Sequence, residues 1–402
     1  MNSIDAINYI HSIPKFIRPL GNANLAGLLD RLGSPQKGLK FIHIAGTNGK
    51  GSTASIIAQI LYSAGYKTGL FTSPFINVFN ERIRINGENI SDTHLGEYTS
   101  KVKNAMEESG CNVSEFAFIT AVAFLYFKDT NCDYVVLETG MGGKLDATNI
   151  IDTSEVSVLT SISLDHMQFL GDTIEEIATE KCGIIKENGI VVTYPNEAVM
   201  DIIEDSAKSK NARLIKTEKA LSDKDGFVYK SKHYPLSLKG EYQPQNAAVA
   251  LEAIFALHDE RITEDAIIKG LTDVRWPARF EFLRDNLVID GGHNIDGIRV
   301  LKKSLLALNS PIILVMSMME DKSYIECIEE ITPIADYIFA SEQPMPRCLS
   351  ANELLKHAKT KGEAQKDCVA AVKKALDMAN EMTVVCVCGS LYLAGEIRKN
   401  YS

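Results

Sequence analysis

The run Ile42-His43-Ile44-Ala45-Gly46-Thr47-Asn48-Gly49-Lys50-Gly51-Ser52-Thr53 joins an alternating apolar segment to a glycine-rich turn that holds one lysine. Small hydroxyl residues close the turn, and the apolar run 56–61 follows at the spacing of a helix face. This order predicts a strand, a loop and a helix. Such a loop directs successive backbone N–H groups and a helix N-terminus to one place, which suits a chain of phosphates.

The polar residues of this turn are candidates for contacts to a nucleoside triphosphate. Lys50 would place a charge near the outer phosphates, and Ser52 or Thr53 a hydroxyl near a magnesium ion. The usual phosphate-loop pattern is G-x-x-x-x-G-K-[ST], but Gly51 stands where Ser or Thr should follow the lysine, and the expected first glycine is absent. The residues alone favour a nucleotide site over an ordinary glycine turn, and both interpretations stay open.

Composition and charge limit the class of protein. With 402 residues the chain is long for one core, which predicts two domains, and 45% hydrophobic and 23% charged residues are typical of a soluble globular protein. No window approaches the ~20 apolar residues of a membrane span, and residues 1–16 show no secretory signal. The net charge of −10 argues against nonspecific nucleic-acid binding. ATP binding would then need locally concentrated positive charge, for which the candidates are Lys50, Arg82, Arg84, Arg275 and Arg279.

The eight cysteines are scattered and form no C-x-x-C pair with metal spacing. Cys386 and Cys388 lie two apart in an apolar run, so both are expected to face one side of a strand as small core residues. This usage fits a reducing cytoplasm. We therefore expect a cytoplasmic protein, and we expect it to be a monomer.

The order of elements predicts an α/β fold with two parts. Strand-like apolar runs in the first part fall at 40–45, 67–72, 133–138, 156–160 and 190–193. Helical periods alternate with them at 52–64, 93–108, 115–128, 173–187 and 243–257. This alternation predicts a mainly parallel sheet flanked by helices, of the phosphate-loop type. Residues 226–238 alternate as in a small hairpin.

A second series of alternating strands and helices begins near Leu287. Its strands are expected at 287–290, 312–317, 336–341 and 383–388, and its helices at 295–308, 321–331, 350–359 and 367–379. We place the boundary near residue 285, giving a central ATP-binding domain at 1–285 and a smaller, Rossmann-like domain at 286–402. Ligands of open α/β sheets bind beyond the carboxyl ends of strands, where the polar residues discussed next fall.

Three of these residues each leave two interpretations open. Glu138 ends a buried-type strand before a glycine-rich turn, so it is either a magnesium ligand or a solvated glutamate. The pair Asp165-His166 follows another strand, and such a pair is more often structural than metal-binding. Lys181 shares an apolar stripe with Ile174, Ala178 and Ile185 on a helix opened by a Thr173–Glu176 capping box. A lysine there is either paired or modified, or it reaches out to water.

The whole chain resembles the folylpolyglutamate synthase and dihydrofolate synthase family of the Mur ligase superfamily. The loop 46–52 matches the family's Gly-Lys-Gly-Ser form, and 138–149 matches its E-x-G-x-G-G-x-x-D-A-T-N signature. The runs 72–74 and 81–87 resemble T-S-P-H-L and E-R-I-x-I-N-G, and 165–178 resembles D-H-x-x-x-L-G-x-T-x-x-x-I-A. Further matches, in the family's order, are E-K-x-G-I at 180–184, G-x-H-Q-x-x-N-A at 240–247, W-P-G-R-x-E at 276–281, D-G-A-H-N at 290–294 and G-S-L-Y-L at 389–393.

This resemblance implies roles for individual residues. Ser73 and Glu138 would hold magnesium, His166 would bind a second magnesium ion, and Lys181 would be carbamylated. Gln243 and Asn246 would lie near the adenine, whose edge suits side-chain amides. The remaining implied nucleotide contacts are the phosphate loop Gly46, Thr47, Asn48, Gly49, Lys50, Gly51, Ser52 and Thr53, together with Arg279, Asp290 and His293.

The chain departs from the family at three substrate-related positions. Phe75 replaces the histidine of T-S-P-H-L, so a polar contact near the substrate is either missing or supplied elsewhere. Ala117 replaces the glutamate of F-E-x-x-T, and Glu115, two residues away, would face differently on a helix. In Asp321-Lys322-Ser323, the serine replaces the last aspartate of D-K-D. Together these changes leave a shifted substrate preference open.

The resemblance implies an ATP-dependent ligase that joins L-glutamate to a folate carboxylate through an acyl phosphate, releasing ADP and phosphate. Dihydropteroate, or both acids, are alternative acceptors, because both reactions use the same machinery. A cell-wall ligase of the Mur type fits the loop but not the 138–149 signature, and no N-K-x-D motif supports a nucleotide-switch protein. The smaller domain is expected to close over ATP and exclude water.

Overall fold

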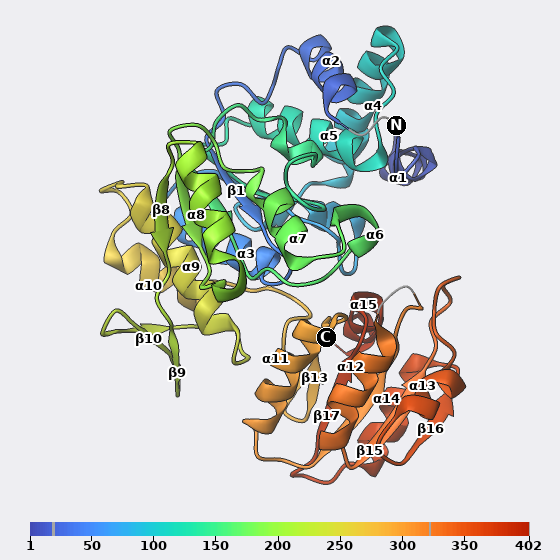
Figure 1. The fold of residues 1–402 in the computed structure, drawn as a ribbon. Helices are drawn as coiled ribbons and strands as arrows, with labels where there is room; N and C mark the ends of the chain where they lie inside the picture. Colours follow the sequence, from blue (N-terminus) through green and yellow to red (C-terminus); the bar gives the residue numbers. More distant parts are fainter. Residues whose placement is uncertain (18–20, 321–322, 402) are drawn as a thin grey trace. The chain divides into compact units, whose positions relative to one another are not determined.

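The computed structural model describes residues 1–17, 21–320 and 323–401, and it forms two compact units (Figure 1). One unit comprises Met1–Ser237 and Pro244–Val274, and the other Leu238–Gln243 and Arg275–Ser402. The sequence-based boundary at residue 285 falls inside the first hairpin of the second unit, between β12 (Glu281–Arg284) and β13 (Leu287–Ile289). The segment 238–243 joins the second unit although the chain then returns to the first.

The first unit is built on an eight-stranded sheet, counted over the described residues. Its order is β4-β3-β2-β5-β1-β6-β7-β8. The six strands β2, β5, β1, β6, β7 and β8 run parallel, and the pairs β2–β3 and β3–β4 are antiparallel. The strands are β1 (Phe41–Ala45), β2 (Thr68–Phe71), β3 (Ile83–Ile85), β4 (Glu88–Asn89), β5 (Tyr134–Glu138), β6 (Val156–Leu159), β7 (Ile190–Thr193) and β8 (Arg213–Lys216). The central strands β1 and β5 are buried throughout and are apolar apart from His43 and Glu138, as is typical of a parallel sheet covered on both faces.

Helices cover the sheet of the first unit. They are α1 (Ser3–Ser12), α2 (Ala23–Arg31), α3 (Lys50–Ser63), α4 (Asp92–Ser109), α5 (Glu115–Asp129), α6 (Met167–Leu170), α7 (Ile174–Cys182), α8 (Met200–Ser209), α9 (Gln243–Ala256) and α10 (Glu264–Asp273). One core lies under α1, α2, α4 and α5, which gather at one end of the unit (Figure 1), and another lies under α7 and α8. The predicted hairpin near 226–238 is part of a small antiparallel sheet of β9 (Leu221–Asp223), β10 (Gly226–Tyr229) and β11 (Lys232–Pro235).

One predicted helix is shorter than its sequence pattern. The expected helix 173–187 is α7, which ends at Cys182, so Ile185 of the expected stripe lies outside it. After Cys182 the N–H groups of Gly183, Ile184 and Ile185 donate to carbonyls three residues back. The chain tightens there because Gly183 packs against the glycine-rich turn, where a Cβ would come within 2.4 Å of the Cα of Lys144.

The second unit contains a six-stranded sheet of the order β12-β13-β17-β14-β15-β16, in its described residues, with only the β12 edge antiparallel. Its remaining elements are β14 (Ile312–Met316), β15 (Tyr337–Ser341), β16 (Gly362–Gln365), β17 (Val384–Cys388), α11 (Ile295–Leu306), α12 (Tyr324–Ile331), α13 (Ala351–His357), α14 (Cys368–Met378) and α15 (Leu391–Tyr401). Cys386 and Cys388 are fully buried in one core, as predicted. The two sheets confirm the expected α/β fold class.

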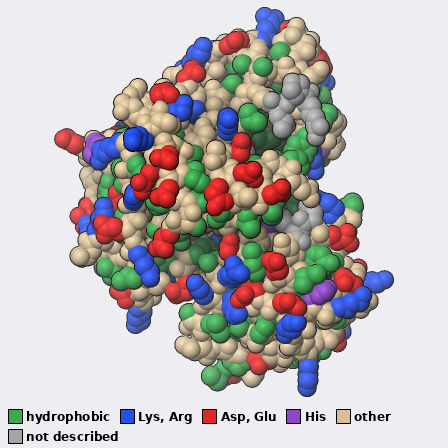
Figure 2. Space-filling model, viewed as in Figure 1, with side chains coloured by type: hydrophobic (Ala, Val, Ile, Leu, Met, Phe, Trp, Pro, Cys, Tyr) green, Lys and Arg blue, Asp and Glu red, His purple; other side chains and the backbone are tan. Residues whose placement is uncertain are grey.

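The described helices include none whose length and apolar content would let it cross a bilayer. Acidic and basic side chains are interspersed over the face drawn in Figure 2, the usual pattern of a solvated surface.

Candidate active site

The loop between β1 and α3 has the geometry that its sequence predicts. Gly49 has a φ of 86°, a value that favours glycine, and a Cβ there would come within 2.4 Å of Asn246 Oδ1. Helix α3 begins at Lys50, so the N–H groups of its first turn point toward the loop. Ser52 and Thr53 lie in that turn and are buried. The loop thus combines a left-handed glycine with a helix N-terminus, the arrangement that binds phosphates.

Lys50 lies over this loop and faces a carboxylate. Its Nζ donates to the carbonyl oxygens of Gly46 at 3.1 Å and Thr47 at 3.2 Å, and lies 4.0 Å from Glu138 Oε1. Glu138 ends β5, which pairs with β1, and its side chain is buried. The structure therefore brings the predicted lysine and the predicted carboxylate together at the carboxyl edge of the sheet.

Ser73 approaches the same carboxylate from the neighbouring strand. It follows β2, and its backbone N–H donates to Glu138 Oε2 at 3.1 Å. A carboxylate and a hydroxyl are hard oxygen donors of the kind that magnesium prefers. The donor set therefore fits the implied metal, although no group of three or more His, Cys, Asp or Glu with metal-binding geometry occurs among the described residues.

His166, unlike Glu138, has an exposed side chain. It precedes α6 with a φ of 53°, its Nε2 lies 4.0 Å from Asp165 Oδ2, and its side chain is 46% exposed. The structure thus pairs His166 with Asp165 and places Ser73 against Glu138. The second metal site at His166 stays a prediction.

Lys181 is buried, which excludes the alternative that it reaches out to water. Its Nζ donates to the carbonyl of Gly46 at 2.8 Å, the same oxygen that Lys50 uses. Burial, and next the charge of Lys50, lower the pKa of Lys181 to about 7. The predicted Thr173–Glu176 capping box is present at the start of α7. We call Gly46, Lys50, Ser73, Glu138 and Lys181 the loop cluster.

Behind the glycine-rich turn lies a buried network that the sequence reasoning missed. The Asp146 carboxylate accepts hydrogen bonds from the Met141 N–H at 2.8 Å and from the Thr148 hydroxyl at 2.5 Å. Because that hydroxyl donates to Asp146, its oxygen accepts from His43 Nε2 at 2.8 Å. Burial lowers the pKa of His43 to about 3, so the ring is neutral. The sequence feature that could have revealed this network is His43, a polar residue inside the apolar run before the loop.

In the second unit, Asp290 is the centre of a separate cluster. Its carboxylate accepts from the Tyr242 hydroxyl at 2.7 Å, the Phe280 N–H at 2.8 Å and the Gly292 N–H at 2.7 Å. Burial raises the pKa of Asp290, while the nearby Arg279 guanidinium opposes the shift. We call Asp290, Tyr242, Phe280 and Gly292 the Asp290 cluster.

The other predicted nucleotide contacts of the second unit adjoin this cluster. A Cβ on Gly291 would lie 2.5 Å from Arg279 Nη1, and His293 Nδ1 lies 2.9 Å from the Gly291 carbonyl oxygen. Gln243 is fully buried at the start of α9, in the second unit, whereas Asn246 lies beside Gly49 in the first. Their contacts to a nucleotide stay predictions.

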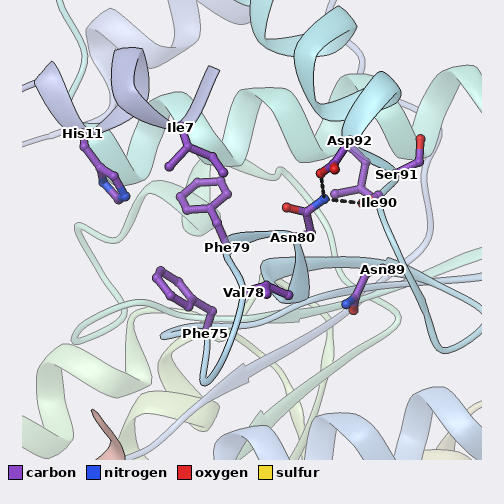
Figure 3. A pocket seen from close by; sticks show the side chains of 10 residues that line it. All are labelled: Ile7, His11, Phe75, Val78, Phe79, Asn80, Asn89, Ile90, Ser91 and Asp92. Atoms are coloured by element: carbon purple, nitrogen blue, oxygen red, sulfur yellow. Dashed lines mark hydrogen bonds between the residues drawn. The ribbon is translucent and has the colours of Figure 1, made fainter. Parts of the chain in front are cut away.

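The three sequence departures fall in different places. Phe75 lines a pocket of about 570 Å³ (Figure 3), and Ala117 is buried in the core under α1 and α5. Glu115 is also buried, and its Oε1 lies 2.9 Å from Nδ1 of His11, which lines the pocket. Of the D-K-D match, Asp321 and Lys322 lie outside the described residues, and Ser323 is the N-cap residue of α12. The pocket is lined by Ile7, His11, Phe75, Val78, Phe79, Asn80, Asn89, Ile90, Ser91 and Asp92.

Comparisons with known proteins show the family of the chain. Residues 44–254 match the Mur ligase middle domain, and residues 278–391 match the Mur ligase glutamate ligase domain. The dihydrofolate synthase/folylpolyglutamate synthase of Bacillus subtilis is 36% identical, over 98% of both chains. The structure of E. coli FolC in complex with DHPP and ADP has a TM-score of 0.91 and 29% identity, over 100% of this chain and 97% of that one. The bifunctional Yersinia pestis synthase, complexed with AMPPNP and Mn ion, has a TM-score of 0.90 and 28% identity, over 100% and 98%.

Proposed function

The chain belongs to the Mur ligase family, to its folylpolyglutamate synthase and dihydrofolate synthase relatives, and from this premise we propose that it ligates L-glutamate to a folate carboxylate. The observation that carries the proposal is the loop cluster, where a lysine and an oxygen-donor pair meet at a phosphate-binding loop. An ATP-dependent acid–amino-acid ligase needs these groups in one place.

The reaction has two steps. A carboxylate oxygen of the acceptor attacks the γ-phosphorus of ATP, and ADP leaves, giving an acyl phosphate. The amine of L-glutamate then attacks the acyl carbon, the carbon–oxygen bond to phosphate breaks, and the amine loses a proton. Such chemistry relies on positioning and charge stabilisation more than on a protein nucleophile.

The residues of the loop cluster divide this work. Lys50, held by the Gly46 and Thr47 carbonyls, directs its charge at the transferred phosphoryl group. The N–H groups at the start of α3 bind the phosphate oxygens. Ser73 and Glu138 would hold magnesium, which supplies charge neutralisation when bound. The Yersinia pestis structure with AMPPNP and Mn ion supports binding of a nucleotide and a divalent metal.

Lys181 is proposed to carry a carbamate. A buried amine with a pKa of about 7 is partly neutral at neutral pH, and its nitrogen can attack CO2 and lose a proton to form the carbamate. The change from cation to anion would support a metal ion beside the loop. A mass increase of one CO2 on the Lys181 peptide, lost on acidification, checks this proposal.

The acceptor is proposed to be a reduced folate, with dihydropteroate as the alternative or as a second acceptor. Both names occur in the Bacillus subtilis relative, so a bifunctional enzyme is consistent with the comparison. Arg279, Asp290 and His293 of the second unit, with Gln243 and Asn246, are proposed as further nucleotide contacts. A cytoplasmic location is proposed because all eight cysteines are free.

The test supplies purified protein with ATP, magnesium and labelled glutamate, and with dihydropteroate or tetrahydrofolate in parallel. We expect ADP release that requires both an acid and glutamate, and a product heavier by one or more glutamyl residues. ADP release without either co-substrate, or no amide product with both acids, would overturn the proposal. The product mass identifies the acceptor.

A further inference from the structure

The connection between β2 and β3 contains a buried carboxylate that binds the backbone of its own loop. Glu81 is 9% exposed and belongs to the short helix η1 (Phe79–Arg82), which directly precedes β3. Its carboxylate accepts hydrogen bonds from the N–H groups of three consecutive residues, Ile76 at 2.8 Å and Asn77 and Val78 at 3.2 Å each. Successive backbone donors that converge on one anion fix the shape of the loop that carries them.

The residues that Glu81 holds come soon after Ser73, a member of the loop cluster. We call residues 73–78 the Ser73 loop. At its start, the Ser73 N–H donates to Glu138 Oε2 at 3.1 Å. At its end lie the three N–H groups that donate to Glu81. The loop is therefore fastened to one carboxylate at each end, and the first of these belongs to the proposed metal site.

Arg82 contacts the middle of the same loop. Its guanidinium carbon lies 5.4 Å from the centroid of the Phe75 ring and 5.5 Å from that of the Phe79 ring, which is the range of a cation–π contact. The Arg82 carbonyl also accepts from the Thr72 N–H at 3.0 Å. Both rings line the pocket drawn in Figure 3. Phe75, which replaces the histidine of the family motif, thus gives the loop a contact with η1.

The elements on either side of the Ser73 loop are anchored independently of Glu81. Phe71 at the end of β2, Phe79 of η1 and Ile83 of β3 are all buried in the core of the first unit. In the loop itself, Val78 is 50% exposed. Removing the Glu81 carboxylate should therefore loosen the loop while the buried side chains keep the flanking elements in place.

We propose that Glu81 is a positioning residue for the divalent metal, because it holds the loop that presents the Ser73 hydroxyl beside Glu138. The inference rests on the proposed function, in which Ser73 and Glu138 are the magnesium ligands. Glu138 is fixed by its place at the end of the central strand β5. Ser73 follows the end of β2, so the direction of its hydroxyl depends on the loop. The E-R-I run 81–83 thereby acquires a role that does not require contact with a substrate.

The experiment measures how much magnesium tightens the binding of AMPPNP to the full chain. Calorimetry gives the Kd for AMPPNP in magnesium and in EDTA, and the ratio of the two is the gain from the metal. We expect Glu81→Gln to keep the Kd in EDTA within about twofold and to reduce the gain about tenfold, the usual effect of removing a group that orients a metal ligand. The magnesium concentration that half-saturates ADP release should rise by the same factor, with kcat at saturating magnesium near the wild-type value.

A double variant separates positioning from a general loss of structure. Ser73→Ala should reduce the gain from magnesium about as much as Glu81→Gln does, because both remove the same ligand from its place. Adding Glu81→Gln to Ser73→Ala should change the gain by less than about twofold, since no hydroxyl is left to position. Glu88→Gln removes the same charge from an exposed position on β4 and should leave the gain unchanged.

An unchanged gain in Glu81→Gln, or losses that add up in the double variant, would overturn the inference. Loss of the cooperative unfolding transition in Glu81→Gln, followed by circular dichroism, would also overturn it, because the carboxylate would then be needed for the fold. A wild type that gains no affinity from magnesium would reject the metal pair itself. Amide formation by the wild type decides the proposed function separately, and the titrations decide the role of Glu81 even if no product forms.

Discussion

The loop cluster and the Asp290 cluster both contain buried ionisable side chains, but these side chains have different hydrogen-bond partners. Lys50 and Lys181 both donate to one neutral carbonyl, that of Gly46, and Lys50 also lies 4.0 Å from the Glu138 carboxylate. Asp290 accepts from Tyr242, Phe280 and Gly292. The first arrangement places a lysine and a carboxylate at the phosphate loop, whereas the second joins three segments of its own unit through one carboxylate. Substitution of Lys50 should therefore act mainly on catalysis, whereas substitution of Asp290 should lower the stability of the second unit in addition to any effect on nucleotide binding.

The largest effect is expected for Lys50→Ala. Loss of a charge aimed at the transferred phosphoryl group should lower kcat by about a thousandfold or more, or roughly 4 kcal/mol. The measurement is ADP release with acceptor and glutamate at saturation. Lys208→Ala, on the exposed face of α8, is the matched control, and its activity should stay at the wild-type level. Full coupling activity in Lys50→Ala would remove the distinction between the clusters.

Asp290→Ala should act on stability. It leaves the Tyr242 hydroxyl and two backbone N–H groups without their acceptor, which costs about 3 kcal/mol of unfolding free energy. Urea unfolding followed by the fluorescence of Trp276, the single tryptophan and a residue of the second unit, measures this loss. The exposed Asp285→Ala should shift the curve little. An equal loss in both variants would mean that the Asp290 hydrogen bonds contribute nothing specific.

His43 gives the first unit a pH dependence. Its pKa falls from about 6.5 unfolded to about 3 folded, so the unfolded chain binds more protons between these values. Its contribution is fully present above pH 6.5 and is lost as the pH falls toward 3, with a drop of about 2 kcal/mol between pH 7 and pH 5. Urea unfolding followed by far-UV circular dichroism should show this drop reduced in His43→Gln. Parallel pH profiles for the two proteins would exclude His43 as the cause.

The smallest effect is expected for Tyr242→Phe. Removing one hydroxyl from the Asp290 carboxylate should cost about 1 kcal/mol, less than Asp290→Ala, because the two backbone donors remain. Tryptophan fluorescence again reports the second unit. A loss as large as that of Asp290→Ala would show that the tyrosine, not the carboxylate, organises the cluster.

The sequence predicted what depends on local pattern. The apolar periods located the central strands and most helices, and the stripe on α7 correctly placed Lys181 on a buried face. The local sequence pattern could not predict that the Gly46 carbonyl accepts the hydrogen bond of Lys181, because Gly46 lies 135 residues away in the chain. The early end of α7 depends on the packing of Gly183 against Lys144, which is also a long-range contact.

In the second unit, too, the sequence pattern did not predict contacts between residues that are far apart in the chain. Resemblance to the family predicts a nucleotide contact for Asp290, which stays a prediction, but it gave no sign that the carboxylate also accepts from Tyr242 and Phe280. Those donors come from two other chain segments, so spacing gave no sign of them. His43 was missed because the alternating pattern places it on the face opposite Ile42 and Ile44, and the pattern does not show that both faces of β1 are buried.

The formation of an acyl phosphate can be followed directly with an acceptor whose carboxylate carries 18O. One labelled oxygen attacks the γ-phosphorus and stays on phosphorus when glutamate displaces phosphate. Mass spectrometry of the released phosphate should therefore find one 18O per product amide formed. Unlabelled phosphate accompanying labelled amide product would contradict an acyl phosphate and the role given to Lys50.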